Sequence, residues 1–201
     1  FTLLGVLLGV SQGWFSALFT PAQAQVLYQT DFEASLSVPV SGKYSLTTAG
    51  GNTYLCLDPA ETATAYPNLV IGDETWQNYT VEARTMFPEG DAWGNLLVHV
   101  LHDPFTAYEY YFNPEWTSLS KKFSDDLPAP VLYAEKGVRL LDGRWSQQRI
   151  EVKDGRLKVW LDGNLILAAE DSEPVESGYI RIGAGLGLMC LDDIRVTSLE
   201  K

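Results

Sequence analysis

The segment 145–173 constrains the fold of this chain more than any other stretch of its sequence. Residues 145–153 and 156–162 each alternate between two faces with the period of two that a half-buried strand requires. Asp154-Gly155 separates the two runs and Asp162-Gly163 follows the second, and Asp-Gly pairs favour two-residue hairpin turns. The segment therefore predicts an antiparallel meander with one apolar and one polar face.

Short strand patterns separated by turn residues continue along the rest of the chain, and no stretch shows a helical period of useful length. Residues 95–101 are almost continuously apolar, which predicts a central strand covered on both faces. Residues 121–130 indicate a polar turn and linker, and the glycine-rich residues 183–187 indicate a turn. Many short strands of this kind predict an all-β fold, a two-sheet antiparallel β-sandwich of the jelly-roll type. The expected strands are 26–32, 42–48, 53–57, 68–71, 79–87, 95–101, 108–112, 131–133, 138–141, 145–153, 156–162, 165–167, 179–183 and 188–197.

The N-terminal segment has the character of a targeting signal. Residues 1–24 carry no charge, contain an apolar run at Leu3–Val10, and end in Ala22-Gln23-Ala24, which fits a signal-peptidase cleavage site. An uncleaved membrane anchor is the alternative, although residues 11–13 interrupt the apolar run below spanning length. We therefore expect a signal peptide at 1–24 and a single domain at 25–201. The mature domain is expected to be secreted, periplasmic or on the cell surface, without a membrane span.

The charge balance restricts the class of partner. The 201 residues include 14 Lys and Arg against 26 Asp and Glu, a formal net charge of -12. Nucleic acids and anionic membrane surfaces require basic patches. The composition therefore argues against both partners.

Cys56 and Cys190 are the two cysteines of the chain. In an exported protein they permit one disulfide between the early and late parts of the sequence. Two buried free thiols are the alternative, because sequence alone does not place the Cβ atoms within bonding reach.

Several motifs carry a resemblance to a known family. The motifs are Trp76–Ala83, Gly143–Val152, Val159–Gly163, Asp171–Gly178 and Leu191–Val196. Through them the chain resembles the concanavalin A-like, or laminin-G-like, jelly rolls of secreted bacterial proteins, in the branch that includes the 3-keto-disaccharide hydrolase domains. The resemblance covers roughly residues 26–199 and implies a carbohydrate-related setting, either as a binding module or as a sugar-cleaving domain.

The two ends of the predicted domain carry acidic residues that could hold a metal. Related jelly-roll modules often hold a structural calcium between an Asp-Phe-Glu-like start and an Asp-Asp end, so the resemblance implies Ca²⁺ at Asp31, Glu33, Asp192 and Asp193. Calcium takes six to eight oxygen ligands, which carboxylates and carbonyls can supply. The alternative is that these acids cap turns and strand ends.

The chain lacks the usual acidic signature of a sugar hydrolase on this fold. Retaining hydrolysis requires two carboxyl groups about 5 Å apart, which family-16 glycosidases provide with a Glu-x-Asp-x-Glu strand that this sequence does not contain. Glu82, Glu109 and Glu151 are the candidate acids if strands bring them together. His99 and His102, three residues apart on a strand, should face opposite sides, which argues against a zinc pair.

Aromatic side chains provide the candidate ligand surface, because sugars stack their C–H faces on rings and hydrogen-bond through hydroxyls. Tyr108, Tyr110 and Phe112 share one face of a strand, which favours the core over a ligand platform. Trp160 instead shares its outward face with charged neighbours. We therefore expect a ligand surface of Arg149, Glu151, Lys158 and Trp160, with the loop residues Trp93 and Trp116 nearby.

The sequence thus favours a secreted, noncatalytic carbohydrate-binding or adhesion module, a monomer that binds a polysaccharide or glycan. The alternative is an enzyme, a glycoside or 3-keto-disaccharide hydrolase acting through the candidate acids. A third interpretation is a structural domain of a cell-surface assembly with no small ligand.

Overall fold

The computed structural model describes residues 24–34, 36, 38–59, 66–89, 91–124, 131–140 and 142–199. The predicted signal peptide, residues 1–24, lies outside these residues apart from Ala24. The described chain is built of strands, and none of its segments forms a helix long and apolar enough to cross a membrane.

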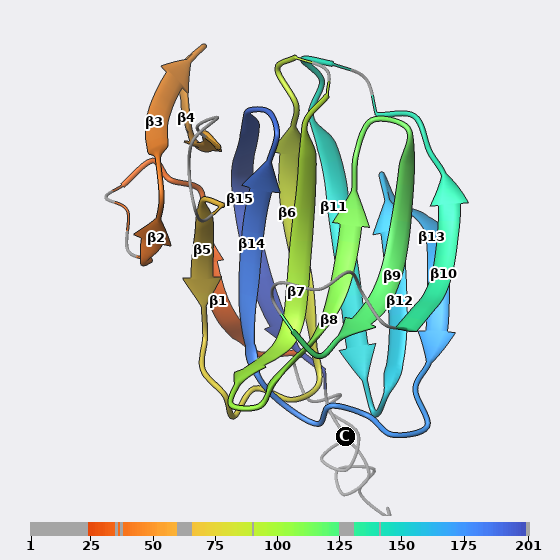
Figure 1. Cartoon of the computed structure of the whole chain (residues 1–201). Coiled ribbons are helices and arrows are strands. Elements are labelled where there is room, and N and C mark those ends of the chain that lie inside the picture. Colours follow the sequence, from red (N-terminus) through yellow and green to blue (C-terminus); the bar gives the residue numbers. More distant parts are fainter. Residues whose placement is uncertain are drawn as a thin grey trace, which may run out of the picture.

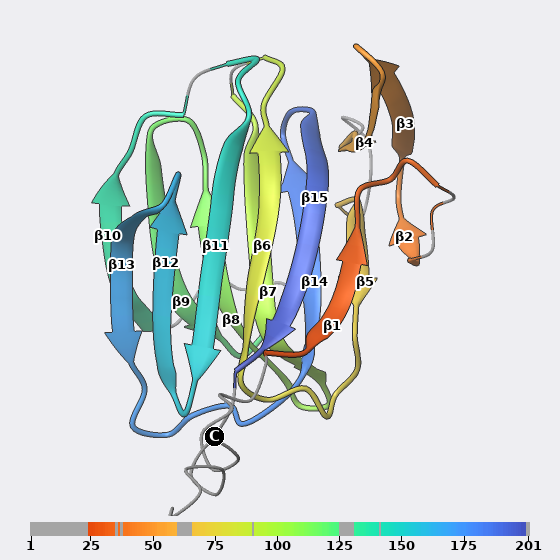
Figure 2. The ribbon, with the colours of Figure 1, turned by 180° about the vertical axis from the view of Figure 1, so that it is seen from behind.

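Two antiparallel sheets pack face to face, which confirms the predicted β-sandwich. Figure 1 shows the seven-stranded sheet in front, and Figure 2 shows the eight-stranded sheet from the other side. The seven-stranded sheet has the order β10-β9-β8-β7-β14-β5-β2, and the eight-stranded sheet has the order β13-β12-β11-β6-β15-β4-β3 with β1 also paired to β15. The seven strands are β2 (Val40–Ser41), β5 (Asn68–Ile71), β7 (Trp93–His102), β8 (Phe105–Phe112), β9 (Trp116–Lys122), β10 (Val131–Gly137) and β14 (Tyr179–Gly185). The eight strands are β1 (Val26–Thr30), β3 (Tyr44–Ala49), β4 (Asn52–Leu57), β6 (Tyr79–Met86), β11 (Ser146–Lys153), β12 (Arg156–Leu161), β13 (Asn164–Glu170) and β15 (Met189–Ser198).

The meander predicted from 145–173 is formed by β11, β12 and β13. Ile150 pairs with Val159 and Val152 pairs with Leu157, and all four side chains are buried between the sheets. The turn residues Asp154, Gly155, Asp162 and Gly163 have positive φ values, as the Asp-Gly signature requires.

The core lies between the sheets and contains the aromatic stripe of β8. Tyr108, Tyr110 and Phe112 are at most 1% exposed, which confirms the prediction that they belong to the core. β7 lies between β8 and β14, and its consecutive residues Leu96 and Leu97, which point to opposite faces, belong to two different buried clusters. The prediction of a central strand is therefore confirmed. The other sheet covers only the inner face of this strand, and on the outer face Leu97 is buried among Val100, Ala107 and Tyr179 of its own sheet.

Strand β9 was not predicted, because its buried positions are polar. Thr117, Ser118, Ser120 and Lys121 are all at most 8% exposed. The Lys121 ammonium donates to a carboxylate oxygen of Asp171 at 2.8 Å and to the Glu173 carbonyl at 2.6 Å. These partners allow a lysine to occupy a position where the alternation rule expects an apolar residue.

Two other local predictions are wrong. Residues 138–140 are not a strand, because the Val138 and Leu140 amides donate to the carbonyls of Glu115 and Pro114 in the β8–β9 turn. Residues 183–185 are not a turn but the end of β14. Gly183 and Gly185 allow large side chains of the neighbouring strand β7 to pack against β14. The turn itself follows at Leu186 and Gly187.

A disulfide joins Cys56 of β4 to Cys190 of β15. The two residues are direct cross-strand partners. The bond therefore ties the β3–β4 hairpin, which projects from one edge of the sandwich in Figure 1, to a central strand.

Candidate functional site

The structure separates the predicted ligand residues onto opposite faces of the molecule. Trp160 lies on β12 of the eight-stranded sheet with its charged neighbours, whereas Trp93 and Trp116 begin β7 and β9 of the seven-stranded sheet. The expectation that Trp93 and Trp116 lie in loops near Trp160 is thus corrected. Parity along one strand predicts which way a side chain points, but it does not tell which sheet a strand joins.

The outer face of the eight-stranded sheet carries a ladder of mutually paired charges. The Arg149 guanidinium lies 4.4 Å from the centre of the Trp160 ring, 3.4 Å from Glu151 and 3.9 Å from Glu82. Lys158 lies 3.6 Å from Glu151. Each of these charged side chains lies within ion-pair distance of an opposite charge, although the Arg149 Nε makes no hydrogen bond among the described residues. Such ladders of paired charges are typical of a solvated sheet face.

The outer face of the seven-stranded sheet carries a different arrangement, a row of four aromatic rings. Tyr66 contacts Trp93 at 5.0 Å between ring centres, Trp93 contacts Tyr111 at 5.6 Å, and Tyr111 contacts Trp116 at 5.0 Å. Tyr66 is 55% exposed and Trp116 is 40% exposed. We call these residues the aromatic row; it crosses β7, β8 and β9 near the upper end of the sheet in Figure 1.

Two glycines of β14 make room for this face. Gly185 pairs with Trp93 and Gly183 pairs with Asn95. A Cβ on Gly185 would lie 2.1 Å from the Trp93 ring, and a Cβ on Gly183 would lie 2.8 Å from the Asn95 amide oxygen. The glycines are therefore needed because the larger side chains of β7 lie across β14.

Three polar side chains lie beside the aromatic row and form what we call the polar patch. The Asn95 amide donates to Glu109 at 2.9 Å, and the Lys122 ammonium lies 3.5 Å from the same carboxylate oxygen. The side chains of Glu109 and Lys122 are only 11% and 12% exposed. Charges held this closely on an outer sheet face have fixed positions and interact more strongly than fully solvated ones.

Tyr111 connects the row to the patch, since it contacts both neighbouring tryptophans and follows Glu109 by two residues on the same face of β8. Burial, and to a lesser degree the charge of Glu109, raises the pKa of the Tyr111 phenol. Its hydroxyl is therefore protonated at neutral pH. The site thus offers rings for stacking next to hydrogen-bond donors and acceptors.

The three candidate catalytic acids do not gather at one site. Glu82 and Glu151 lie on the neighbouring strands β6 and β11 of the eight-stranded sheet and both contact Arg149, whereas Glu109 lies on the outer face of the other sheet. Packed sheets are about 10 Å apart, so Glu109 cannot share a sugar ring with either acid. The contacts of Glu109 come from an amide and an ammonium rather than from a second carboxyl group.

The acids at the two ends of the domain both contact the β3–β4 hairpin. Glu33 accepts from the Thr53 amide at 2.6 Å, and buried Asp192 accepts from the Asn52 side chain at 2.9 Å. The Arg84 guanidinium lies 3.6 Å from Asp192 and also bonds Asp193. Among the described residues, no three acidic, His or Cys side chains gather as a metal site.

The two histidines have separate environments. His99 is 2% exposed, and its ring nitrogens lie 2.5 Å from the Val175 carbonyl and 2.6 Å from the Gln77 carbonyl. Burial lowers the pKa of His99 despite these two acceptors. The register of β7 shifts between Val98 and Leu101, and His99 has a positive φ in this irregularity. Through the Val175 carbonyl, the His99 ring links the segment before β14 to the core. His102 instead contacts Tyr179.

Asn95, Tyr111 and Lys122 were not singled out from the sequence. Tyr111 could have been found, because Glu109 and Tyr111 alternate with the core stripe of β8 and must therefore face outward. Lys122 could not, since its strand was not recognised. Asn95 becomes visible only through its pairing with Gly183.

The two-sheet architecture defines the class of the protein: it is a concanavalin A-like jelly roll. Similar solved structures include a carbohydrate-binding module, CBM66, from Bacillus subtilis, with 14% identity, a TM-score of 0.59, and coverage of 78% of this chain and 92% of that chain. The laminarinase catalytic domain from Thermotoga maritima has 10% identity, a TM-score of 0.63, and coverage of 89% and 99%. The Bacillus licheniformis β-glucanase has 13% identity, a TM-score of 0.58, and coverage of 86% and 98%. Identities this low show the shared fold alone.

The family is established by a match over most of the chain. The model of the 3-keto-alpha-glucoside-1,2-lyase-like domain matches residues 48–197, and the chain belongs to this family. A comparison of this chain with curated protein sequences found no match.

Proposed function

We propose that this protein is a carbohydrate-binding module that holds a glycan on the outer face of its seven-stranded sheet. The observation that carries the proposal is the aromatic row lying directly beside the polar patch. Trp93, Tyr111 and Trp116 offer faces and edges on which sugar C–H groups stack. Glu109 and Lys122 offer an acceptor and a donor for hydroxyl groups, and hydrogen bonds to charged groups are the stronger ones.

The central ring of the row provides the test. Tyr111→Ala is expected to weaken glycan binding by about 2 kcal/mol, roughly 30-fold in Kd, because truncating a central aromatic anchor typically has this effect. The measurement is a glycan array followed by calorimetry with the best soluble oligosaccharide. Trp160→Ala, the matched aromatic truncation on the opposite sheet, should bind like the wild type. A silent array, or equal binding by the wild type and Tyr111→Ala, would reject the proposal.

Membership of the lyase-like family and the polar patch support a second function, elimination from a 3-keto-α-glucoside. The C3 ketone acidifies the C2 proton. The Glu109 carboxylate would accept this proton, the Lys122 ammonium would stabilise the enolate oxygen, and the C1–O bond would break. The leaving oxygen takes up a proton, and the remaining ring becomes a 1,2-unsaturated ketone. This route requires one base rather than two convergent carboxyl groups, in agreement with the isolation of Glu109.

The elimination can be followed directly, because a conjugated enone absorbs in the near ultraviolet. A 3-keto-α-glucoside disaccharide should develop this absorbance with the wild type and lose it with Glu109→Gln, while Tyr111→Ala should mainly raise KM. Unchanged turnover by Glu109→Gln would contradict the assignment. If the wild type binds the sugar but does not turn it over, the elimination function is rejected and only the binding function stands.

We also propose the structural calcium at the predicted acids Asp31, Glu33, Asp192 and Asp193, where the Asn52 side chain of the β3–β4 hairpin lies beside Asp192. Arg84 is already present as a cation there, so calcium binding requires this side chain to move aside. Calcium is expected to raise the thermal midpoint, and a chelator to lower it, because a ligand that binds only the folded state stabilises it. Asp192→Asn should remove this response. An unchanged midpoint after thorough chelation would show that the acids are held by Arg84, Asn52 and Thr53 alone.

An exported setting is supported by the disulfide and by the uncharged N-terminal segment, since disulfides persist in oxidising compartments. Expression of the chain with a start codon in a bacterial host is expected to release a mature protein. Mass spectrometry should find its N-terminus at Gln25. A cytoplasmic, uncleaved product would contradict this.

A further inference from the structure

The aromatic row continues into a groove at the end of the sandwich. One recess of about 750 Å³ is lined by Trp93 and Tyr111 together with Pro114, Glu115 and Asp142. A second recess of about 430 Å³ is lined by the same Pro114, Glu115 and Asp142 and by residues 138–140. Because three residues line both recesses, the two are adjacent parts of one groove, which we call the end groove. Each volume lies in the range that small-molecule sites occupy.

The ridge between the two recesses is fixed by its own hydrogen bonds. Asn113 accepts from the backbone amides of Glu115 and Trp116 at 2.9 and 2.8 Å. The Glu115 and Pro114 carbonyls accept from the amides of Val138 and Leu140 at 2.9 and 3.0 Å. The groove is therefore preformed, and a ligand would not have to order it, which lowers the entropic cost of binding.

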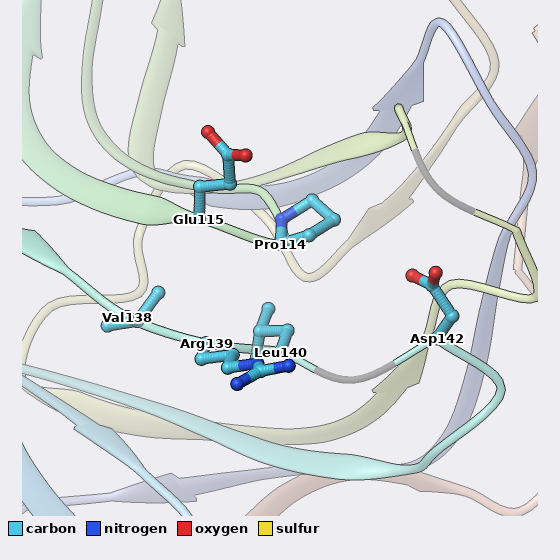
Figure 3. A pocket seen from close by; sticks show the side chains of 6 residues that line it. All are labelled: Pro114, Glu115, Val138, Arg139, Leu140 and Asp142. Atoms are coloured by element: carbon cyan, nitrogen blue, oxygen red, sulfur yellow. The ribbon is translucent and has the colours of Figure 1, made fainter.

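The side chains of the end groove differ from those of the polar patch. Glu115, Arg139 and Asp142 are exposed. Figure 3 shows the Asp142 carboxylate and Pro114 on facing sides of the groove, and the Glu115 carboxylate pointing away from Arg139. Asp91 adds a further carboxylate to the first recess. Three carboxylates thus line the first recess, and a single guanidinium lies in the second.

We propose that the end groove binds the next sugar units of a chain whose first units lie on the aromatic row, so that the ligand is a neutral oligosaccharide rather than a single sugar or a polyuronate. The inference rests on the proposed carbohydrate-binding function. Continuity with Trp93 and Tyr111 gives the chain its path from one region to the other. The three carboxylates of the first recess, on a protein of net charge -12, repel anionic glycans.

The test is calorimetry with malto-, cello- and laminari-oligosaccharides from disaccharide to hexasaccharide, with oligogalacturonates as the anionic series. For the series that binds, wild-type affinity should rise about tenfold or more with length and then reach a plateau. Arg139→Ala with Asp142→Ala, or Val138→Trp filling the second recess, should flatten this rise and leave disaccharide affinity unchanged. The matched control, Arg156→Ala with Glu170→Ala, removes an exposed ion pair on the other sheet and should keep the rise.

The possible outcomes separate this inference from the function on which it rests. Binding that is independent of length, or a rise that survives both groove variants, overturns the groove assignment and leaves the aromatic row standing. Tighter binding of oligogalacturonates overturns the neutral class of ligand. Failure of every neutral series to bind overturns both the groove assignment and the proposed site. Thermal melts of each variant confirm that it is folded.

Discussion

Replacing Cys56 and Cys190 together by Ala is expected to lower the free energy of unfolding by about 5 kcal/mol. The bond closes a loop with a sequence separation of 134 residues, and cross-links across long loops remove the most conformational entropy from the unfolded chain. Both cysteines are also buried, so the alanines leave small cavities. Equilibrium denaturation in urea under oxidising conditions measures the difference.

Reductant separates the cross-link from the packing effect. Wild-type stability should fall when reductant is added, and the double Ala variant should not respond. A wild type that is indifferent to reductant, with two thiols that titrate in the unfolded oxidised protein, would show that the bond does not form. The β3–β4 hairpin would then be held by strand pairing alone.

The second large effect concerns the ion pair between Lys121 and Asp171, whose side chains are 10% and 8% exposed. Lys121→Met is expected to lower the free energy of unfolding by about 3–5 kcal/mol, because it leaves a carboxylate buried without its cation. Lys121→Met with Asp171→Asn should recover much of this loss, since the amide is neutral and still accepts from the Tyr108 hydroxyl. A loss below about 1 kcal/mol in the single variant, typical of a solvated pair, would contradict this account.

The pH dependence of the same pair gives an independent check. Burial raises the pKa of Asp171, but the hydrogen bonds from Lys121 and Tyr108 outweigh burial and hold the pKa below its usual range. The carboxylate therefore contributes stability above the unfolded pKa of about 3.9 and loses it as pH falls through the lower folded pKa. The gap between wild type and Lys121→Met should be largest near neutral pH and should narrow as the pH falls below about 4. A gap that stays constant would assign the effect to packing.

The local patterns of the sequence were sufficient for most of the fold. Alternation and Asp-Gly turns specify β11, β12 and β13, because a half-buried strand and its turn are determined by neighbouring residues. Strand β9 was not predicted, because its buried Lys121 is stabilised by Asp171, which lies fifty residues away in the sequence. The glycines of residues 183–185 predict a turn when only the sequence is considered. In the structure they lie in a strand, where glycine leaves room for a large cross-strand neighbour, and the sequence does not identify that neighbour.

The candidate site was harder to predict from the sequence than the fold, because it also depends on contacts between residues that are distant in the sequence. Trp93, Trp116 and Glu109 were all candidates, but they come together only through the pairing of β7, β8 and β9. Trp160 and Arg149 were predicted to share an outward face, and they lie in contact. Only the ion pairs to residues distant in sequence, such as that between Arg149 and Glu82, show that the charges of this face are paired with one another. Cross-strand neighbours in space, rather than neighbours in sequence, distinguish the two faces.

The central claim is that the ligand surface lies on the seven-stranded sheet, and a nitrogen–proton spectrum of the tryptophan indoles tests it most directly. Titration with the oligosaccharide selected on the glycan array is read at the indole N–H signals, assigned by single Trp→Phe variants. The signals of Trp93 and Trp116 should shift along a saturable curve while that of Trp160 stays in place. A saturable shift of Trp160, with Trp93 and Trp116 unmoved, would place the ligand on the eight-stranded sheet and contradict the account.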